Sequence, residues 1–399
     1  MTIPFDLVAK PPKQLTAREE CALLERALEL RENSTIRLRL AELQNRLDDF
    51  DKTIALFDSA GPVADFATAK ALVAAHLGRG SPEDLVLALA SAKTAEMLAD
   101  CNIGRAEALA CQASVWHRTG DSEQMVQVAA AALELNPDNS DALRLIGGHW
   151  LATHQPEQTL ALCDEVAAKG TAHSQLLGIR TQALAQRGDI DAARELAGLE
   201  HWLFQSIPPA PNGWADLPSF HAALRHELLE CSALRNGRHG TASIASLRVD
   251  EPASATTPAM RALQQLIIDH VRAVVDQLPS SAHPWLRMRP QRAHLQMWCV
   301  ITGAEGYERW HMHPTGWASG GYYVAVPAAA QHGNDTAGCL EFGLPHRPIG
   351  HEAAAAFGSR LVRPSTGLLN LFPSHAYHRT HPHGADDQRI CVAYDVIPD

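Results

Sequence analysis

Apolar positions in the first half of the chain recur at the spacing of an α-helix between about 106 and 200. The turns Gly120–Asp121 and Gly188–Asp189 lie 68 residues apart, and at half that distance, 34 residues, His154–Gln155 again separates two helical patterns. After Gly120 a second helix is expected from Glu123 to Asn136–Pro137, where proline cannot continue it. The pattern therefore predicts helical pairs that stack with a period of 34 residues.

Small and large side chains occupy matching positions in successive units. Ala113 and Trp116 share one helix face, and Gly147 and Trp150 stand at the corresponding positions of the next unit. This arrangement resembles a tetratricopeptide repeat, in which small residues let helices approach and large ones fill the gaps. Residues 16–100 are also helical by pattern, but their spacing drifts, which indicates degenerate repeats. Such a solenoid is either a stacking scaffold or a concave surface for a peptide or protein.

The pattern changes after Leu199. A turn-rich stretch at 207–213 marks a boundary, and from about 294 the apolar period becomes two. Short strands with glycine and proline corners predict a jelly roll. The expected elements are helices at 219–230 and 260–278, which would buttress the sheet, and strands at 295–301, 321–326, 367–372 and 390–397.

These patterns predict an α + β chain of two domains. The first, at 1–200, is an α-solenoid of tetratricopeptide-like repeats. The second, at 201–399, has a helical lead-in at 201–290 and a jelly-roll core at 291–399.

Charge and cysteine content narrow the function classes. The formal net charge is −11 and no basic run interrupts it, so nucleic acid is not an expected partner. No apolar run reaches about 18 residues, so no membrane span is expected. The 8 cysteines form no CxxC pair, which fits reduced thiols and a cytoplasmic location.

Two imidazoles stand two residues apart in the segment 310–314. On a strand, His311 and His313 face the same side, which suits two ligands of one metal. His378 follows 65 residues after His313, and Arg389 comes 11 residues later. If both point inward, His378 completes the metal site and Arg389 binds the far carboxylate of a five-carbon diacid. Three protein ligands on one octahedral face leave room for a 2-oxo acid and dioxygen.

Several blocks of the second domain are similar to those of 2-oxoglutarate/Fe(II) oxygenases that are often fused to tetratricopeptide repeats. The similarity is close over about 290–399 and is one of architecture in the repeat half. It implies a double-stranded β-helix, Fe(II), and 2-oxoglutarate held by the arginine of the last strand. The blocks are His311-Met-His-Pro-Thr-Gly-Trp317, Ser319-Gly-Gly-Tyr-Tyr-Val324, Gly338-Cys-Leu-Glu-Phe-Gly343, Phe372-Pro-Ser374 with His378-Arg-Thr380, and Arg389 with Ala393-Tyr-Asp-Val-Ile-Pro398.

Two positions depart from the family pattern. The second metal ligand is usually a carboxylate, whereas this chain has His313 there. Either three histidines bind the metal, which we favour, or only two bind it and His313 supports them from outside. Leu344 also replaces an acidic residue, and nearby Glu341 is expected to face solvent.

Other residues near these blocks are weaker candidates. Only one of the adjacent Tyr322 and Tyr323 can face the pocket, and we expect Tyr322 and Ser319 to contact the cosubstrate. His375 precedes His378 by three residues, a spacing that directs it to the other face.

The sequence thus predicts an enzyme that uses Fe(II), 2-oxoglutarate and O2 to hydroxylate an amino-acid, peptide or protein side chain. The repeat domain would help to bind that substrate or a protein partner. The alternative is a cupin-like scaffold or sensor that binds a metal or small acid without turnover, although cupins usually add a glutamate and 315–319 contains none. A closed zinc site would recruit cysteine, and none is near His311.

Overall fold

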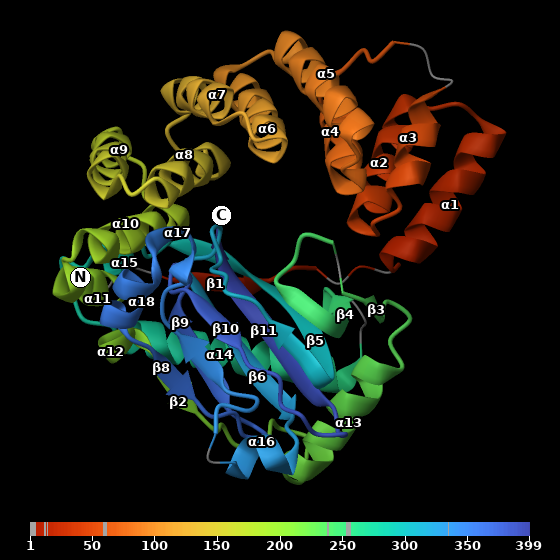
Figure 1. Cartoon of the computed structure of the whole chain (residues 1–399). Helices are drawn as coiled ribbons and strands as arrows, with labels where there is room; N and C mark the ends of the chain where they lie inside the picture. The colour runs from red at the N-terminus through yellow and green to blue at the C-terminus, as the bar shows by residue number, and fades with distance from the viewer. Residues whose placement is uncertain are drawn as a thin grey trace. The chain divides into compact units, whose positions relative to one another are not determined.

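A computed structural model describes residues 5–11, 13, 15–58, 62–237, 239–252, 257–333 and 335–399. The chain divides into two compact units. One is Leu15–Ala172, which we call the helical unit; the other, the sheet unit, combines His173–Asp399 with the N-terminal residues up to 14. Figure 1 labels the elements of both. None of the helices in the described ranges is long and apolar enough to cross a membrane.

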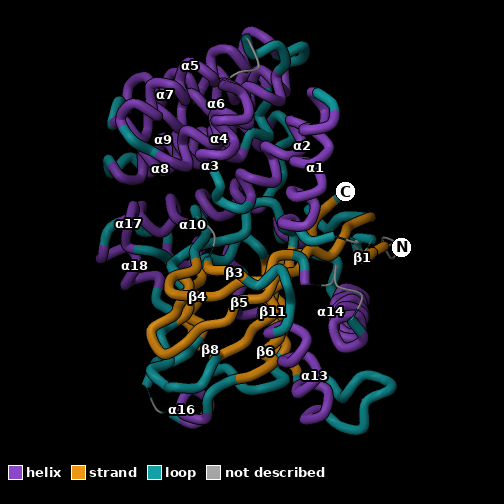
Figure 2. Tube along the Cα trace, turned by 90° about the vertical axis from the view of Figure 1, so that its right-hand side faces the viewer, coloured by secondary structure: helices purple, strands orange, loops and turns teal. Residues whose placement is uncertain are grey.

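The helical unit consists of antiparallel helical pairs (Figure 2). Its helices are α1 (Ala17–Leu30), α2 (Ser34–Arg46), α3 (Phe50–Asp58), α4 (Phe66–Arg79), α5 (Pro82–Leu98), α6 (Asn102–Thr119), α7 (Ser122–Leu135), α8 (Ser140–Ala152) and α9 (Pro156–Ala168).

The period of 34 residues is visible in the backbone as well as in the sequence. The second helix of each pair begins at Ser122, Pro156 and Ile190 in turn. The residue two positions earlier is left-handed each time, with φ of 84° at Gly120, 57° at His154 and 97° at Gly188. Histidine tolerates this conformation better than most side chains, although glycine adopts it without strain. The turn geometry therefore persists where its glycine does not.

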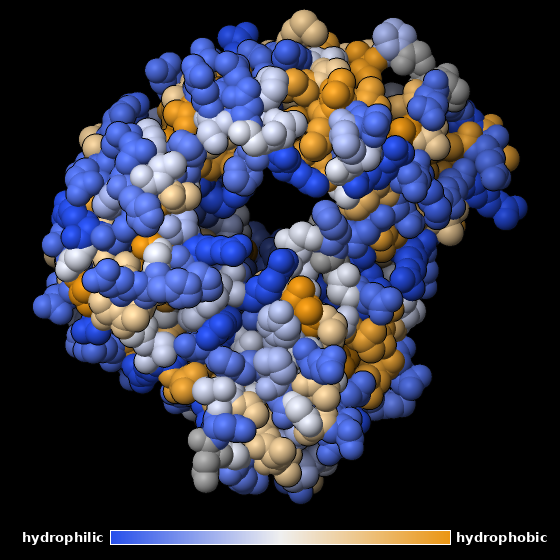
Figure 3. All heavy atoms as spheres, viewed as in Figure 1, coloured by the Kyte–Doolittle hydropathy of each residue, from blue (hydrophilic) through white to orange (hydrophobic). Residues whose placement is uncertain are grey.

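Alanine lines the contacts between these helices. Ala88, Ala92 and Ala95 of α5 and Ala106 and Ala108 of α6 are all 0% exposed. Small side chains let helix axes approach closely, so the unit gains its packing from proximity rather than from bulky side chains. Figure 3 shows that hydrophilic side chains cover most of the visible surface, with hydrophobic ones in smaller groups.

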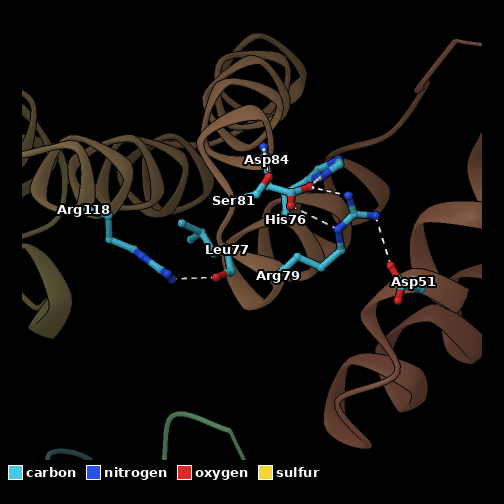
Figure 4. A network of polar contacts seen from close by, with 7 residues as sticks. All are labelled: Asp51, His76, Leu77, Arg79, Ser81, Asp84 and Arg118. Atoms are coloured by element: carbon cyan, nitrogen blue, oxygen red, sulfur yellow. Dashed lines mark hydrogen bonds and ion pairs between the residues drawn. The ribbon is translucent and has the colours of Figure 1, made fainter.

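A buried carboxylate joins α4 to α5 (Figure 4). Asp84 is 1% exposed and lies 3.1 Å from His76 Nδ1 and 3.1 Å from Arg79 Nε. Burial opposes its ionisation, but hydrogen bonds with His76, Ser81 and Arg79 outweigh this and lower its pKa to about 2. Arg79 also bonds the exposed Asp51 of α3 at 3.1 Å, so the network extends to the preceding pair.

The sheet unit contains a larger and a smaller sheet. The larger has the order β2-β9-β6-β11-β5-β4-β3, with β1 parallel to β5, and the smaller has the order β10-β7-β8. The strands are β1 (Asp6–Ala9), β2 (Phe204–Ser206), β3 (Arg235–Asn236), β4 (Ser243–Asp250), β5 (Arg292–Glu308), β6 (Ala318–Ala325), β7 (Leu340–Phe342), β8 (Arg360–Val362), β9 (Leu369–Pro373), β10 (His378–Thr380) and β11 (Arg389–Pro398).

Helices cover this sheet system, as the sequence predicts. The helix α14 contributes Leu263, Ile267 and Val271, all 0% exposed, to a core shared with the strands. The helices are α10 (Ser174–Arg187), α11 (Ile190–Ala197), α12 (Leu199–Trp202), α13 (Leu217–Leu229), α14 (Pro258–Gln277), α15 (Pro284–Arg287), α16 (Ala328–His332), α17 (His346–Ile349) and α18 (His351–Phe357).

The last helical pair of the repeating pattern belongs to the sheet unit. Ser174 Oγ of α10 donates to the carbonyl of Gly316 at 2.5 Å, and Arg194 of α11 bonds the carbonyl of Phe357 at 3.0 Å. The two units therefore divide at residues 172 and 173, whereas the sequence pattern places a boundary near residue 200.

Glycine-to-alanine changes at two sites of the helical unit should have opposite effects. An added Cβ at either Gly120 or Gly148 meets nothing within 4 Å, so only the backbone responds. Gly120→Ala should lower the free energy of unfolding by about 1 kcal/mol because φ is left-handed there. Gly148→Ala, inside α8, should raise it by roughly 0.5–1 kcal/mol. Urea unfolding followed by far-ultraviolet circular dichroism measures both, and shifts of the same sign would contradict this account.

Loss of Asp84 should destabilise the helical unit in a pH-dependent way. Asp84→Ala should cost roughly 2 kcal/mol at neutral pH because His76 and Arg79 lose a buried charged partner. The folded pKa of about 2 lies below the ordinary 3.8, so the contribution is present above pH 3.8 and is lost as pH falls through about 2. Unfolding midpoints should therefore converge with wild type in acid. Asp51→Ala, at the exposed end of the network, should cost less than about 0.5 kcal/mol.

Candidate metal and cosubstrate site

Backbone pairing brings His311 against His378. His311 lies in the segment between β5 and β6, and His378 begins β10. Each residue donates its backbone N–H to the carbonyl of the other at 2.9 Å, which forms an isolated bridge. The backbone N–H of His313 donates to the carbonyl of Ser374 at 2.9 Å, so the second histidine is fixed beside the same segment.

The three predicted histidines converge on one point. One ring nitrogen from each of His311, His313 and His378 lies within 4.8 Å of the other two. The His311 and His378 rings are 4.2 Å apart between centroids, and His313 stacks on His378 at 5.1 Å. Within the described part of the chain, this is the group of side chains arranged to hold a metal ion.

Hydrogen bonds at Nδ1 prepare the other ring nitrogens for a metal. His311 Nδ1 lies 2.7 Å from the carbonyl of Arg309, and His378 Nδ1 lies 2.9 Å from that of Ala376. A carbonyl only accepts, so both Nδ1 atoms carry the proton and both Nε2 atoms keep a lone pair. His313 Nδ1 faces Asp395 at 2.7 Å, and its buried Nε2 has no hydrogen-bond partner among the described atoms. The three imidazoles therefore fit a metal ion.

The electrostatics agree with neutral ligands. Burial lowers the pKa of His311 to about 3, and the neighbouring His313 ring lowers it further. Burial, followed by the His311 and His313 rings, holds the pKa of His378 well below its ordinary value. At neutral pH both rings are uncharged, which is the state that binds a metal.

Arg389 is a buried cation with neutral partners. It begins β11 and is 3% exposed. Its guanidinium donates to the carbonyl of Gly338 and to the hydroxyl of Thr380, both at 3.1 Å. Neither acceptor carries the negative charge that a buried guanidinium would be expected to pair with. The arrangement leaves Arg389 available to an anionic ligand.

A small cavity joins the histidines to Arg389. It encloses about 80 Å³, and its walls include the apolar side chains of Val300, Leu340 and Phe372. Alternation along β11 places Arg389, Cys391 and Ala393 on the cavity side. The lining residues are Trp298, Val300, Glu308, His311, His313, Gly320, Gly321, Tyr323, Leu340, Asn370, Phe372, His378, Thr380, Arg389, Cys391 and Ala393.

The structure does not bring Tyr322 and Ser319 to the cosubstrate. The hydroxyl of Tyr322 bonds Nε2 of His221 at 2.7 Å outside the cavity, and it is the adjacent Tyr323 that lines it. Ser319 is 0% exposed and donates to Asp395 Oδ1 at 2.6 Å. Ser319 and Tyr322 are three residues apart, so a regular strand points them to opposite faces and could not have placed both in one pocket.

Two further candidates lie outside the histidine group. Glu341 accepts from Arg379 at 2.8 Å and lies 2.7 Å from His381 Nε2, so it is held by these partners instead of facing open solvent. His375 Nε2 lies 2.8 Å from the carbonyl of Leu196, away from His378 as expected. Burial raises the pKa of Cys391 in the cavity to about 12, so it stays a thiol.

Sequence reasoning missed two carboxylates of this region. Asp395, behind His313, stands in a quoted family block, but nothing in the pattern assigned it a role. Glu308 lines the cavity, where burial raises its pKa and its Oε1 has no partner among the described atoms. It ends the long strand β5, and the alternation of that strand gave no separate signal for it.

Comparisons with known proteins give the same class. Residues 296–395 match the family model described as "Putative 2OG-Fe(II) oxygenase". Among solved structures, a prolyl-4-hydroxylase from Pseudomonas putida is 15% identical, with 54% of this chain and 99% of that chain covered, at a TM-score of 0.34. HygX from Streptomyces hygroscopicus, with nickel and 2-oxoglutarate bound, is 13% identical over 51% and 86%, at 0.34.

The structure of YrrB, a TPR protein with an unusual peptide-binding site, is 13% identical, with 45% of this chain and 94% of that chain covered, at a TM-score of 0.32. No curated protein matches the chain. The matched residues 296–395 contain the three histidines and Arg389. The chain therefore carries a domain of the 2OG-Fe(II) oxygenase family, whose cofactors are Fe(II) and 2-oxoglutarate.

Proposed function

We propose that this chain is a 2-oxoglutarate- and Fe(II)-dependent dioxygenase that hydroxylates a side chain of an amino acid, peptide or protein. The observation that carries the proposal is one cavity with three bare imidazole nitrogens at one place and a buried, anion-ready arginine at another. In this proposal His311, His313 and His378 hold the iron. When bound, the iron supplies the activation of dioxygen that the oxidation of an unactivated C–H bond requires.

Arg389 binds and orients the cosubstrate. Its planar guanidinium can donate two parallel hydrogen bonds to the distal carboxylate of 2-oxoglutarate, which fixes the direction of the molecule. Thr380 holds the guanidinium from one side, and the carbonyl of Gly338 holds it from another. Because Arg389 is 3% exposed, water competes little for these bonds.

The walls of the cavity exclude water from the reaction. Val300, Leu340 and Phe372 offer no hydrogen bonds, so a substrate group that enters must displace solvent. Trp298 stacks on His313 with 5.5 Å between ring centroids and closes one side of the metal group. A cavity of about 80 Å³ admits a side chain more readily than a bulky ring system, in keeping with an amino-acid or peptide substrate.

The architecture supports a matching proposal for the fold. We infer that the larger and smaller sheets form a double-stranded β-helix, since His378 comes from the smaller sheet and Arg389 from the larger, yet both line one cavity. We also infer that the helical unit is a tetratricopeptide-like solenoid, on the basis of its 34-residue turns, and that it binds a polypeptide substrate or partner. The eight free cysteines fit a reducing compartment such as the cytoplasm.

Loss of Arg389 should abolish tight binding of 2-oxoglutarate. Anaerobic titration of the protein with Fe(II) and 2-oxoglutarate should produce the visible charge-transfer band of a chelated 2-oxo acid. Arg389→Ala should raise the dissociation constant roughly 100-fold because a buried carboxylate would lose its charged partner. Arg379→Ala, which removes a surface guanidinium bonded to Glu341, is the matched control and should leave the constant unchanged. The absence of a band in iron-loaded wild type would contradict the oxygenase proposal.

Turnover should depend on each of the three histidines. With Fe(II), O2 and 2-oxoglutarate, wild type should form succinate, and His311→Ala, His313→Ala and His378→Ala should each lower the rate at least about 100-fold. His381→Ala is the control, since its imidazole bonds Glu341 outside the metal group. Tight binding of iron and 2-oxoglutarate with no succinate from any preparation would favour the cupin-like scaffold instead.

A further inference from the structure

We propose that Asp395 is a positioning residue that supplies, through His313, the negative charge that a carboxylate ligand would otherwise bring to the metal. The inference rests on the proposed iron site. It concerns the protein's own side chains behind that site, which the ligand set alone does not explain.

The geometry of Asp395 is specific to His313. The carboxylate Oδ1 lies 2.7 Å from His313 Nδ1, and the residue is 6% exposed. Asp395 follows Arg389 on β11 by an even number of residues, so alternation directs both toward the same face of the sheet. One strand thus carries the cosubstrate arginine near its start and the partner of the metal histidine near its end.

The three histidines are not equivalent. His311 and His378 donate from Nδ1 to neutral backbone carbonyls, whereas His313 donates to a carboxylate. A carboxylate draws the Nδ1 proton toward itself and makes the opposite nitrogen a stronger donor to a metal. His313 stands where a related enzyme would place its carboxylate ligand, so the substitution leaves the metal one negative charge short. Asp395 restores part of that charge from one hydrogen bond away.

Two serines hold Asp395 in this role. Ser319 Oγ donates to Asp395 Oδ1 at 2.6 Å, and Ser374 Oγ lies 2.6 Å from Ser319 Oγ. Ser319 has a single hydroxyl proton and gives it to Asp395, so Ser374 must donate to Ser319. Both serines are 0% exposed. The chain of donors ends on the carboxylate from both sides, which favours its ionised form and fixes the His313 tautomer with Nε2 bare.

A second histidine–carboxylate pair in the same unit provides a matched control. Glu341 lies 2.7 Å from His381 Nε2 and is 9% exposed, yet His381 is not in the metal group. Glu341→Gln therefore removes the same charge from a similar pair without touching the metal site.

The experiment compares metal binding by Asp395→Asn, Glu341→Gln and wild type, all as full-length chains. Metal-free protein is titrated with Co(II), whose visible spectrum reports binding without any turnover. Asp395→Asn should weaken Co(II) binding about 10-fold to 100-fold, and Glu341→Gln should not change it. With Fe(II) and 2-oxoglutarate under anaerobic conditions, the charge-transfer band of Asp395→Asn should move to higher energy, because a less electron-rich iron gives up charge less readily.

A second variant guards against loss of folding. Ser319→Ala keeps the carboxylate but removes one of its donors, so it should shift the band in the same direction by a smaller amount. Circular dichroism and the thermal midpoint of the metal-free proteins establish that each variant is folded. Should Asp395→Asn not fold, an unchanged band and unchanged Co(II) affinity in Ser319→Ala would overturn the inference.

The two proposals fail in different ways. If wild type binds Co(II) or Fe(II) in a manner that His378→Ala does not disturb, the iron site itself is wrong. If His378→Ala abolishes binding while folded Asp395→Asn matches wild type in affinity and band position, the iron site stands and only the role of Asp395 is overturned.

Discussion

The site depends on the backbone bridge between His311 and His378. Two hydrogen bonds of 2.9 Å join the segment that leaves β5, in the larger sheet, to β10, in the smaller sheet. Without this bridge the two sheets would have no fixed relation at the point where the histidines meet. The bond from His313 N–H to the Ser374 carbonyl extends the same contact by one residue pair. Metal geometry in this protein is therefore a property of sheet pairing as much as of side chains.

The segment after the histidines is anchored by an aromatic pair. Trp285 and Trp317 stack with 4.8 Å between centroids, and each indole N–H donates to the backbone carbonyl of the other, at 2.7 and 3.0 Å. Both side chains are fully buried with every donor satisfied, which makes the contact costly to rearrange. Rigid support of this kind keeps metal ligands in place when no metal is bound.

The sequence identifies the chemistry better than it identifies the supporting structure. The His-x-His pair, His378 and Arg389 were predictable because each is a polar residue in an otherwise apolar strand context and their blocks resemble a known family. The long helices and strands were predictable from their periodicity, and α14 and β11 lie within a few residues of the expected ranges. Strands of three residues, such as β7 and β10, are too short to show a period.

Errors arose where contacts between distant segments decide the outcome. Ser319 looks like a free hydroxyl in the sequence, but Asp395 lies 76 residues away and captures it. Tyr322 and Tyr323 are chemically alike, and only the register of β6 against β9 and β11 decides which one faces the cavity. The role of Asp395 could not be read from its neighbours in the chain, because its partner His313 belongs to another segment.

The packing of α10 beneath the metal segment bears on how such proteins could be assembled from separate genes. Gly178 of α10 lies so near that a Cβ there would come within 2.9 Å of Met312, the residue between the two metal-segment histidines. Ser174, four residues earlier, is tied to Gly316. An ancestral oxygenase that gained its repeats by simple fusion would have needed no such contacts. The last repeat has instead become part of the catalytic domain's own foundation, so a cut between repeats and enzyme at residue 200 would remove support from the site it was meant to isolate.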